Sequence, residues 1–411
     1  MKYGGAREIL GTYIFFGMRL ALPLIALPLF SHILSPGDMG DLLAAQSLGL
    51  LGSIFIQYGF HQSAPRELSL TSDLAEHRLI ASRVVQCQLV NCATAAIIIG
   101  ILFAHGSHSS AVVALTMSAI ITAIGTGMSS AWFFRGIGRA TLGMAFDFAG
   151  QAIGLILIAL PVYLKFGVGS IAVAYAVGPL ISAIIGLMLV VQKTGGLVRI
   201  PLRESLSRLR TGTDLFFVRG SSAVLTTGSI WLVSIMASSA QAAYFGIASK
   251  LVGAATSLTQ PVLFSIMPRV ASRASSAPRE AVAIAIRFGA MLLLLGLCSA
   301  ILLQIFAPLV ISLLFSQDMA PARYFVVALA WICIPMALRD TIGELVLIPF
   351  HADKYVARSV VIAMLTGTLT AVIAIPQIGG WGMIVARYSA EAVAIILLTW
   401  WGRNVIRRRQ G

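Results

Sequence analysis

Charged side chains are scarce in this sequence. Only 11% of the 411 residues are Asp, Glu, Lys or Arg, whereas soluble domains carry about 25%. Apolar residues make up 58% of the chain, and the mean hydropathy is +0.92. This composition excludes a soluble globular domain and indicates an integral membrane protein that crosses the bilayer many times.

Residues that build reactive centres are also few. The four cysteines, Cys87, Cys92, Cys298 and Cys333, fall in apolar stretches and have no metal-ligand spacing, which indicates small buried side chains. The sequence contains no Walker motif and no nucleophile–base arrangement. We therefore predict no enzymatic activity, no catalytic residues, no cofactor and no metal site.

Apolar stretches that can cross a bilayer recur along the whole chain. A spanning helix needs about 20 mostly apolar residues, and the first stretch is longer than the apolar core of a signal peptide. The sequence thus predicts an all-α protein with about twelve transmembrane helices and no cleaved leader. The predicted spans are 9–33, 40–63, 81–104, 111–134, 142–164, 169–191, 213–236, 242–267, 282–305, 324–350, 357–376 and 382–402.

The distribution of basic residues predicts the orientation. An even number of spans places both termini on one side of the membrane. The connections on that side hold 21 of the 29 Lys and Arg residues, and those on the other side hold only Lys165 and Arg323. Cytoplasmic loops carry the excess of basic residues, so both termini are expected in the cytoplasm. The net charge of +14 is then mainly a topology signal, and no nucleic-acid partner is expected.

The chain divides into two halves of six spans. We predict an N-terminal lobe at 1–192, a cytoplasmic basic linker at 193–212 and a C-terminal lobe at 213–411. The linker fits either a basic interfacial helix or a solvated connection. The apolar segment 306–322 is expected to form a separate, non-spanning helix on the outer surface.

The two halves are related by a faint repeat. Shifting the second half by 203 residues places Ser35 on Ser238 and the Pro65-Arg66 pair on Pro268-Arg269. Six helices followed by six in the same orientation form a parallel repeat with a pseudo-two-fold axis along the membrane normal. Transporters built in this way hold the substrate near the interface of the repeats.

Six basic residues fall inside the predicted spans. A cation at the bilayer centre costs about 3 kcal/mol on insertion scales, so an intramembrane charge indicates a functional site by default. Arg19 lies near the middle of the first span, where it follows a Phe-Phe pair, and Arg219 follows a second such pair. The other basic residues within spans are Lys250, Arg287, Arg339 and Arg387.

These charges suggest two groups with different roles. Arg19, Arg219, Lys250 and Arg287 are expected to bind an anionic part of a substrate, because the planar arginine fork suits phosphate. The first half offers Arg19 no deep carboxylate partner. The second group is expected either to couple an ion or to form internal salt bridges, and it comprises Arg339, Asp340, Glu344, Arg387 and Glu391.

Two local motifs are distinctive. The first motif lies in residues 34–68, with Leu34 and Gly40 at a turn between spans, followed by Tyr58-Gly59-Phe60 and Pro65-Arg66. The second is AWFFRGIGRA at 131–140, which closes the fourth span. With these motifs the chain resembles the Wzx-type polysaccharide flippases of the multidrug/oligosaccharidyl-lipid/polysaccharide (MOP) exporter superfamily. The resemblance implies a MATE-like, V-shaped bundle of two six-helix lobes that works by alternating access.

The resemblance also implies a function. Such a flippase moves undecaprenyl-diphosphate-linked oligosaccharide units of O-antigen, capsule or exopolysaccharide from the cytoplasmic to the periplasmic leaflet of the bacterial inner membrane, coupled to an ion gradient. Its expected partners are this lipid-linked substrate, membrane lipid, and the polymerase and chain-length proteins of polysaccharide assembly. The alternative is a cation-drug/proton antiporter of the same superfamily that uses Asp340, Glu344 and Glu391.

Overall fold

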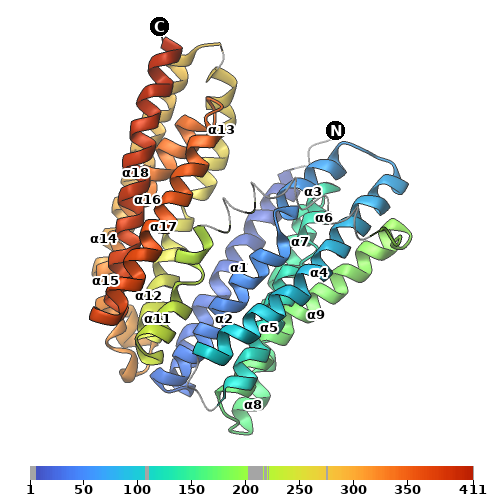
Figure 1. Cartoon of the computed structure of the whole chain (residues 1–411), viewed down its shortest axis with the longest axis vertical. Helices are drawn as coiled ribbons and strands as arrows, with labels where there is room; N and C mark the ends of the chain where they lie inside the picture. Colours follow the sequence, from blue (N-terminus) through green and yellow to red (C-terminus); the bar gives the residue numbers. More distant parts are fainter. Residues whose placement is uncertain are drawn as a thin grey trace. The chain divides into compact units, whose positions relative to one another are not determined.

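The computed structural model describes residues 6–106, 111–201, 216, 220, 222–274 and 276–410, and every regular element within them is a helix (Figure 1). The chain forms two compact units. Unit 1 comprises Met1–Ala223 and Thr227–Ile235, and unit 2 comprises Val224–Thr226 and Met236–Gly411. The predicted linker at 193–212 lies mostly outside the described residues, so the predicted domain boundaries stay a prediction.

Unit 1 is a bundle of long apolar helices joined by short connections. Its helices are α1 (Ala6–Ile33), α2 (Pro36–Gln57), α3 (Phe60–Ser69), α4 (Leu74–Gly106), α5 (Val112–Gly127), α6 (Ala131–Gly136), α7 (Ala140–Leu157), α8 (Ala159–Tyr163), α9 (Val168–Thr194) and most of α11 (Ser229–Met236). The helix α1 packs on α7, and α5 lies between α2 and α9.

Unit 2 is a second helical bundle, in which α17 and α18 lie side by side (Figure 1). Its helices are α12 (Ser239–Ser257), α13 (Gln260–Ala274), α14 (Pro278–Leu314), the short η1 (Gln317–Met319), α15 (Ala322–Ala330), α16 (Cys333–Asp340), the π-helical η2 (Thr341–Leu347), α17 (Asp353–Ile378) and α18 (Gly380–Gln410).

The described residues contain ten helices that are long and apolar enough to cross a membrane. The helical segments Ser239–Leu263 and Ser265–Ala274, which cover α12 and α13 and meet at a bend of 44°, would together make an eleventh span. These helices match eleven of the twelve predicted spans and confirm the all-α membrane fold. The remaining span, predicted at 213–236, lies largely outside the described residues, so the count of twelve stays a prediction.

One predicted element is wrong. The segment 306–322 does not begin a separate surface helix, because α14 continues without a break to Leu314. Pro308 lies inside this helix. Prolines are tolerated inside transmembrane helices because local adjustments and neighbouring groups satisfy the freed backbone carbonyl, so a proline was a poor marker of a helix end here.

The structure gives the two serines matched by the repeat the same role. The Ser35 hydroxyl accepts a hydrogen bond from the amide of Asp38 at 3.2 Å, and the Ser238 hydroxyl accepts one from the amide of Gln241 at 3.3 Å. Each serine thereby caps the N-terminus of a long helix. Both helices, α2 and α12, are followed by a short helix with an internal proline, which supports the repeat.

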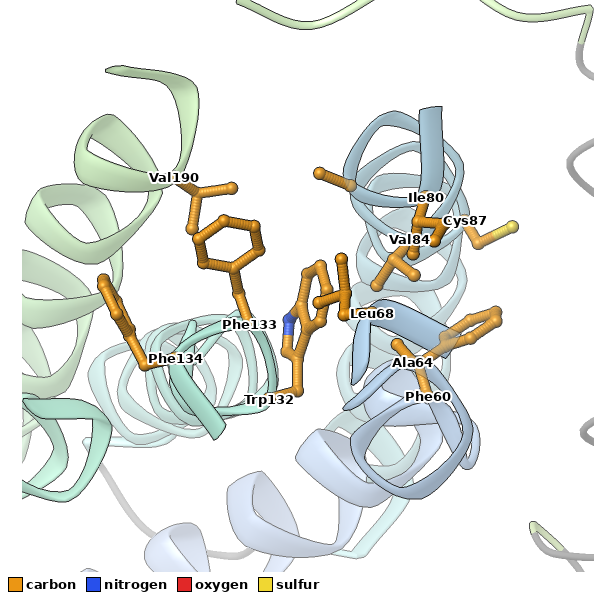
Figure 2. Packing of buried hydrophobic residues seen from close by; sticks show 11 residues of the cluster. Phe60, Ala64, Leu68, Ile80, Val84, Cys87, Trp132, Phe133, Phe134 and Val190 are labelled. Atoms are coloured by element: carbon orange, nitrogen blue, oxygen red, sulfur yellow. The ribbon is translucent and has the colours of Figure 1, made fainter. Parts of the chain in front are cut away.

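The fourth span is broken into α5 and α6, and α6 is held by an aromatic core. Figure 2 shows the Trp132 side chain directed toward Leu68 and the Phe133 side chain directed toward Val190. Trp132 and Phe133 are at most 2% exposed. Because α3 and α9 supply these partners, the short helix α6 is fixed against two longer ones, and so is the arginine that follows its aromatic residues.

Glycines allow helices α5, α7 and α9 of unit 1 to pack closely. A Cβ added at Gly125 of α5 would lie 2.6 Å from the backbone nitrogen of Leu180 on α9. A Cβ added at Gly178 of α9 would lie 2.2 Å from the carbonyl oxygen of Gly150 on α7. Glycine is therefore required for these helices to approach so closely, as is typical of membrane helix pairs.

Candidate functional site

A polar cavity of about 280 Å³ lies inside unit 1. We call it the unit 1 cavity. Its walls come from α1, α2, α3, α5, α6, α7 and α9, together with Thr227. The charged side chains that line it are Arg19, Arg135 and Asp147, so its formal charge is positive with His61 neutral. Its volume is close to the lower end of the range for small-molecule sites.

The Arg19 side chain reaches the cavity because α1 packs along α7. The rings of Phe15 and Phe148 lie 5.9 Å apart across this seam. One turn further along α1, the Nη1 atom of Arg19 donates a hydrogen bond to Oδ2 of Asp147 at 3.0 Å. The arginine side chain is 41% exposed and the carboxylate 17% exposed, so this ion pair lies on an open wall of the cavity.

This ion pair corrects the prediction that the first half offers Arg19 no deep carboxylate partner. Asp147 lies about two turns into α7 and is held from its other side. The hydroxyl of Ser129, in the break between α5 and α6, donates to Oδ1 of Asp147 at 2.6 Å and accepts the amide of Ala131 at 3.3 Å. Both carboxylate oxygens of Asp147 therefore have donors.

Arg135 is a site residue that the sequence-based analysis missed. It was assigned to a cytoplasmic connection, but it lies in α6 and lines the unit 1 cavity. Its Nη1 atom donates to the carbonyl oxygen of His61 at 3.4 Å, and the guanidinium interacts electrostatically with Asp147 and Arg19. The sequence feature that could have identified Arg135 is its position directly after the aromatic residues that close the fourth span.

Unpaired acceptor oxygens also face this region. The Gln57 side chain donates through Nε2 to the carbonyl of Thr126 at 3.2 Å, which leaves its buried Oε1 without a partner among the described residues. The buried Oε1 of Gln151 is likewise unpaired there. Both glutamines line the cavity. Buried polar atoms are normally hydrogen-bonded, so these two oxygens lack the partners that are usual for buried acceptors.

Unit 2 gathers most of the second predicted group of charges. Arg339 donates through Nη1 to Oε1 of Glu391 at 2.6 Å and through Nη2 to Oδ1 of Asp340 at 2.8 Å. The alternative of internal salt bridging thus holds for these three residues. Glu391 pairs with Arg339 rather than with Arg387, which instead donates to the hydroxyl of Ser249 at 3.3 Å.

Glu344 differs from the other acids of this group. It lies on the π-helical segment η2 and is half-buried. Within the described chain it has neither a hydrogen bond nor an ion pair within 4.0 Å, although it interacts electrostatically with Asp340 and Arg339. π-Helical segments are frequent at functional sites, and the predicted ion-coupling role stays a prediction for Glu344.

Two of the other predicted substrate-binding residues lie outside unit 1. Lys250 is half-buried on α12, next to the serine that contacts Arg387, and Arg287 is exposed on α14. Both belong to unit 2, whereas Arg19 belongs to unit 1. Arg219 lies outside the described residues. The convergence of these four residues on one substrate therefore stays a prediction.

Comparison with known proteins shows the family. The sequence pattern of the family described as "Polysaccharide biosynthesis protein" matches residues 11–275, well over half of the chain. The chain belongs to this family. It is therefore a membrane transporter of polysaccharide biosynthesis rather than an enzyme, and the predicted resemblance to the Wzx-type flippases is confirmed.

One curated relative extends the match beyond the family pattern. A Shigella dysenteriae protein whose name describes it as an O-antigen transporter is 21% identical over 394 residues, which cover 95% of this chain and 98% of the relative. The two proteins therefore correspond over almost their whole lengths. The similarity to this relative thus extends past residue 275, where the family pattern ends.

Two solved structures show the fold. An inward-facing multidrug resistance MATE family transporter of the MOP superfamily has a TM-score of 0.74 and 15% identity, covering 95% of this chain and 98% of that one. The lipid II flippase MurJ, in an inward closed conformation, has a TM-score of 0.73 and 15% identity, covering 95% and 87%. This member of the polysaccharide biosynthesis family thus has the MOP superfamily fold.

Proposed function

We propose that the chain is a flippase for a lipid-linked oligosaccharide carrying a diphosphate, which it moves from the cytoplasmic to the periplasmic leaflet of a bacterial inner membrane. The observation that carries the proposal is the unit 1 cavity, where Arg19 and Arg135 outnumber the single carboxylate Asp147. The names of the relative and of the lipid II flippase agree with a substrate of this class.

The cavity chemistry matches the head of such a substrate. Arginine forks bind phosphoryl oxygens through paired charge-assisted hydrogen bonds, and Arg19 and Arg135 reach the cavity from different helices. The unpaired oxygens of Gln57 and Gln151 suit the hydroxyl donors of a sugar. A diphosphate joined to a sugar presents phosphoryl oxygens and hydroxyl donors side by side, while its lipid tail stays in the bilayer.

Further parts of the proposal extend to unit 2. Arg219, Lys250 and Arg287 are proposed to add positive charge along the substrate path, and the half-buried Glu344 to couple transport to an ion gradient. Both termini are proposed to lie in the cytoplasm, because the basic connections lie on their side. Polymerase and chain-length proteins are the proposed partners, since they would act on the flipped units.

The test is complementation of a strain that lacks its own flippase, with surface polymer as the readout. Wild type should restore the polymer, Arg19→Ala should lose most of it, and Arg19→Lys should keep part of it because one charge remains. Arg279→Ala, which removes an exposed arginine at the start of α14, is the matched control and should restore the polymer fully. Equal restoration by all variants would contradict a phosphate-binding role for Arg19.

A cation-drug/proton antiporter is the second candidate. Asp147 favours it, because a carboxylate does line the unit 1 cavity. Against it, that carboxylate is already paired with Arg19 at 3.0 Å, and Arg135 adds a second positive charge that repels cations. Drug resistance conferred by the wild-type chain and abolished by Asp147→Asn, without polymer restoration in any strain, would favour this candidate over the flippase.

A further inference from the structure

Asp147 accepts hydrogen bonds from two donors of the unit 1 cavity. Its Oδ2 accepts from Arg19 at 3.0 Å and its Oδ1 accepts from the Ser129 hydroxyl at 2.6 Å, while Arg135 lies within electrostatic reach. Carboxylate and phosphate oxygens bind the same arginine fork. The donors that the cavity would offer an anionic ligand are thus already engaged by a residue of the protein itself.

The second arginine explains why a carboxylate is present there. Without Asp147, two guanidinium groups would line one cavity of about 280 Å³ and repel each other. With Asp147 in place, the empty cavity keeps a smaller positive charge. An arriving diphosphate can replace the carboxylate on Arg19, because it carries more negative charge and has more acceptor oxygens than one carboxylate.

We propose, resting on the flippase function above, that Asp147 is an internal counter-ion that competes with the substrate diphosphate for Arg19. It holds the arginine when the cavity is empty, is displaced on binding, and returns to the arginine as the product leaves. A transport site must bind strongly enough to load its substrate and weakly enough to release it. Asp147 lowers the affinity of the cavity and thereby allows release in the outer leaflet.

The exposure of the pair permits this exchange. The Arg19 side chain is 41% exposed and Asp147 17% exposed, so the ion pair borders the cavity instead of being sealed in the protein. The unit 2 pair of Arg339 and Glu391 provides the contrast, because there the side chains are only 28% and 12% exposed. An arginine that a ligand must reach is expected to be exposed to a degree similar to that of Arg19.

The test is equilibrium binding of radiolabelled inorganic pyrophosphate to the purified full-length chain in detergent. Asp147→Asn should bind pyrophosphate about fivefold more tightly than wild type, because the neutral side chain no longer competes with pyrophosphate for Arg19. The factor corresponds to the loss of one partly exposed ion pair. Asp147→Glu, which keeps the charge, should bind as wild type does. Glu280→Gln is the matched control, because it removes one exposed carboxylate paired with Arg273, and it should leave the affinity unchanged.

The outcomes separate this inference from the proposed function. Equal or weaker pyrophosphate binding by Asp147→Asn, with a wild-type melting temperature, would overturn the counter-ion role and leave the flippase function standing. Absence of binding in both wild type and Asp147→Asn would overturn the anion site and this role together. If Asp147→Asn melts early, Asp147→Ser is the second neutral variant, and the same fivefold gain is required of it.

Discussion

At the residue scale, the structure separates two kinds of charge within the helices. The ion pair of Arg19 and Asp147 borders an open cavity, and its exchange for a ligand is the inference proposed above. Arg339 instead binds two acids, Asp340 and Glu391, whose side chains are at most 12% exposed. A charge facing hydrocarbon alone is costly, and in this second set each acid is compensated by Arg339.

The Arg339–Glu391 pair should therefore show energetic coupling. Arg339→Met and Glu391→Gln should each lower the melting temperature. Arg339→Met leaves two buried acids without their cation, at a cost of about 3–5 kcal/mol, whereas Glu391→Gln should cost less because Arg339 keeps Asp340. The double variant should lose less than the two single losses combined. Thermal unfolding in detergent measures all three variants. Additive losses would show that the two side chains do not depend on each other.

Individual charges were partly predictable from the sequence. Arg19 stands out because it interrupts an apolar run, and the structure places it on a cavity. Its partner Asp147 is 128 residues away on another helix, and one sequence does not show which helices are neighbours. Arg135 was missed for a local reason: the break between α5 and α6 extends the span beyond the apolar stretch.

At the element scale, broken helices position the site. The fourth span breaks between Gly127 and Ala131, and the break supplies Ser129, which holds Asp147. A second break, at Tyr58 and Gly59, separates α2 from α3, and both residues have positive φ there, at 39° and 80°. Hydropathy predicts a continuous span across such breaks, so the sequence located the helices but not these interruptions.

Glycine contacts between α7 and α9 should be essential for the cavity wall. Gly178→Ala would place a methyl group against the backbone of Gly150, and such overpacking typically costs about 1–3 kcal/mol. Because α7 carries Asp147, we expect a lower melting temperature together with reduced polymer restoration. Gly100→Ala on α4 is the matched control, since no atom lies within 4 Å of the added Cβ. An equal response of both variants would contradict this packing argument.

At the scale of the whole molecule, the predicted repeat of the two halves does not extend to the charges within their helices. The N-cap serines Ser35 and Ser238 keep the same hydrogen bond, but the carboxylate cluster is found only in unit 2 among the described residues. The all-α class was readable from the sequence, and the repeat stays a prediction that the two N-cap serines support. The contribution of each unit to the substrate path could not be read from the sequence, because it depends on contacts between distant helices.

The orientation of the molecule is also a prediction at this scale. Since 21 of 29 basic residues fall on the side of the termini, both ends should lie in the cytoplasm. Green fluorescent protein fused to either end should fluoresce, and alkaline phosphatase fused to either end should be inactive. Active phosphatase at one end only would mean an odd number of spans.

The central claim, that the unit 1 cavity binds the diphosphate of a lipid-linked oligosaccharide, is tested most directly by flipping in reconstituted vesicles. The measurement compares wild type with the double variants Arg19→Ala/Arg135→Ala and Arg19→Lys/Arg135→Lys, using undecaprenyl-diphosphate-linked oligosaccharide. The account predicts rapid flipping by wild type, at least a tenfold loss with the alanine pair, and an intermediate rate with the lysine pair. Equal rates in all three proteins would contradict it.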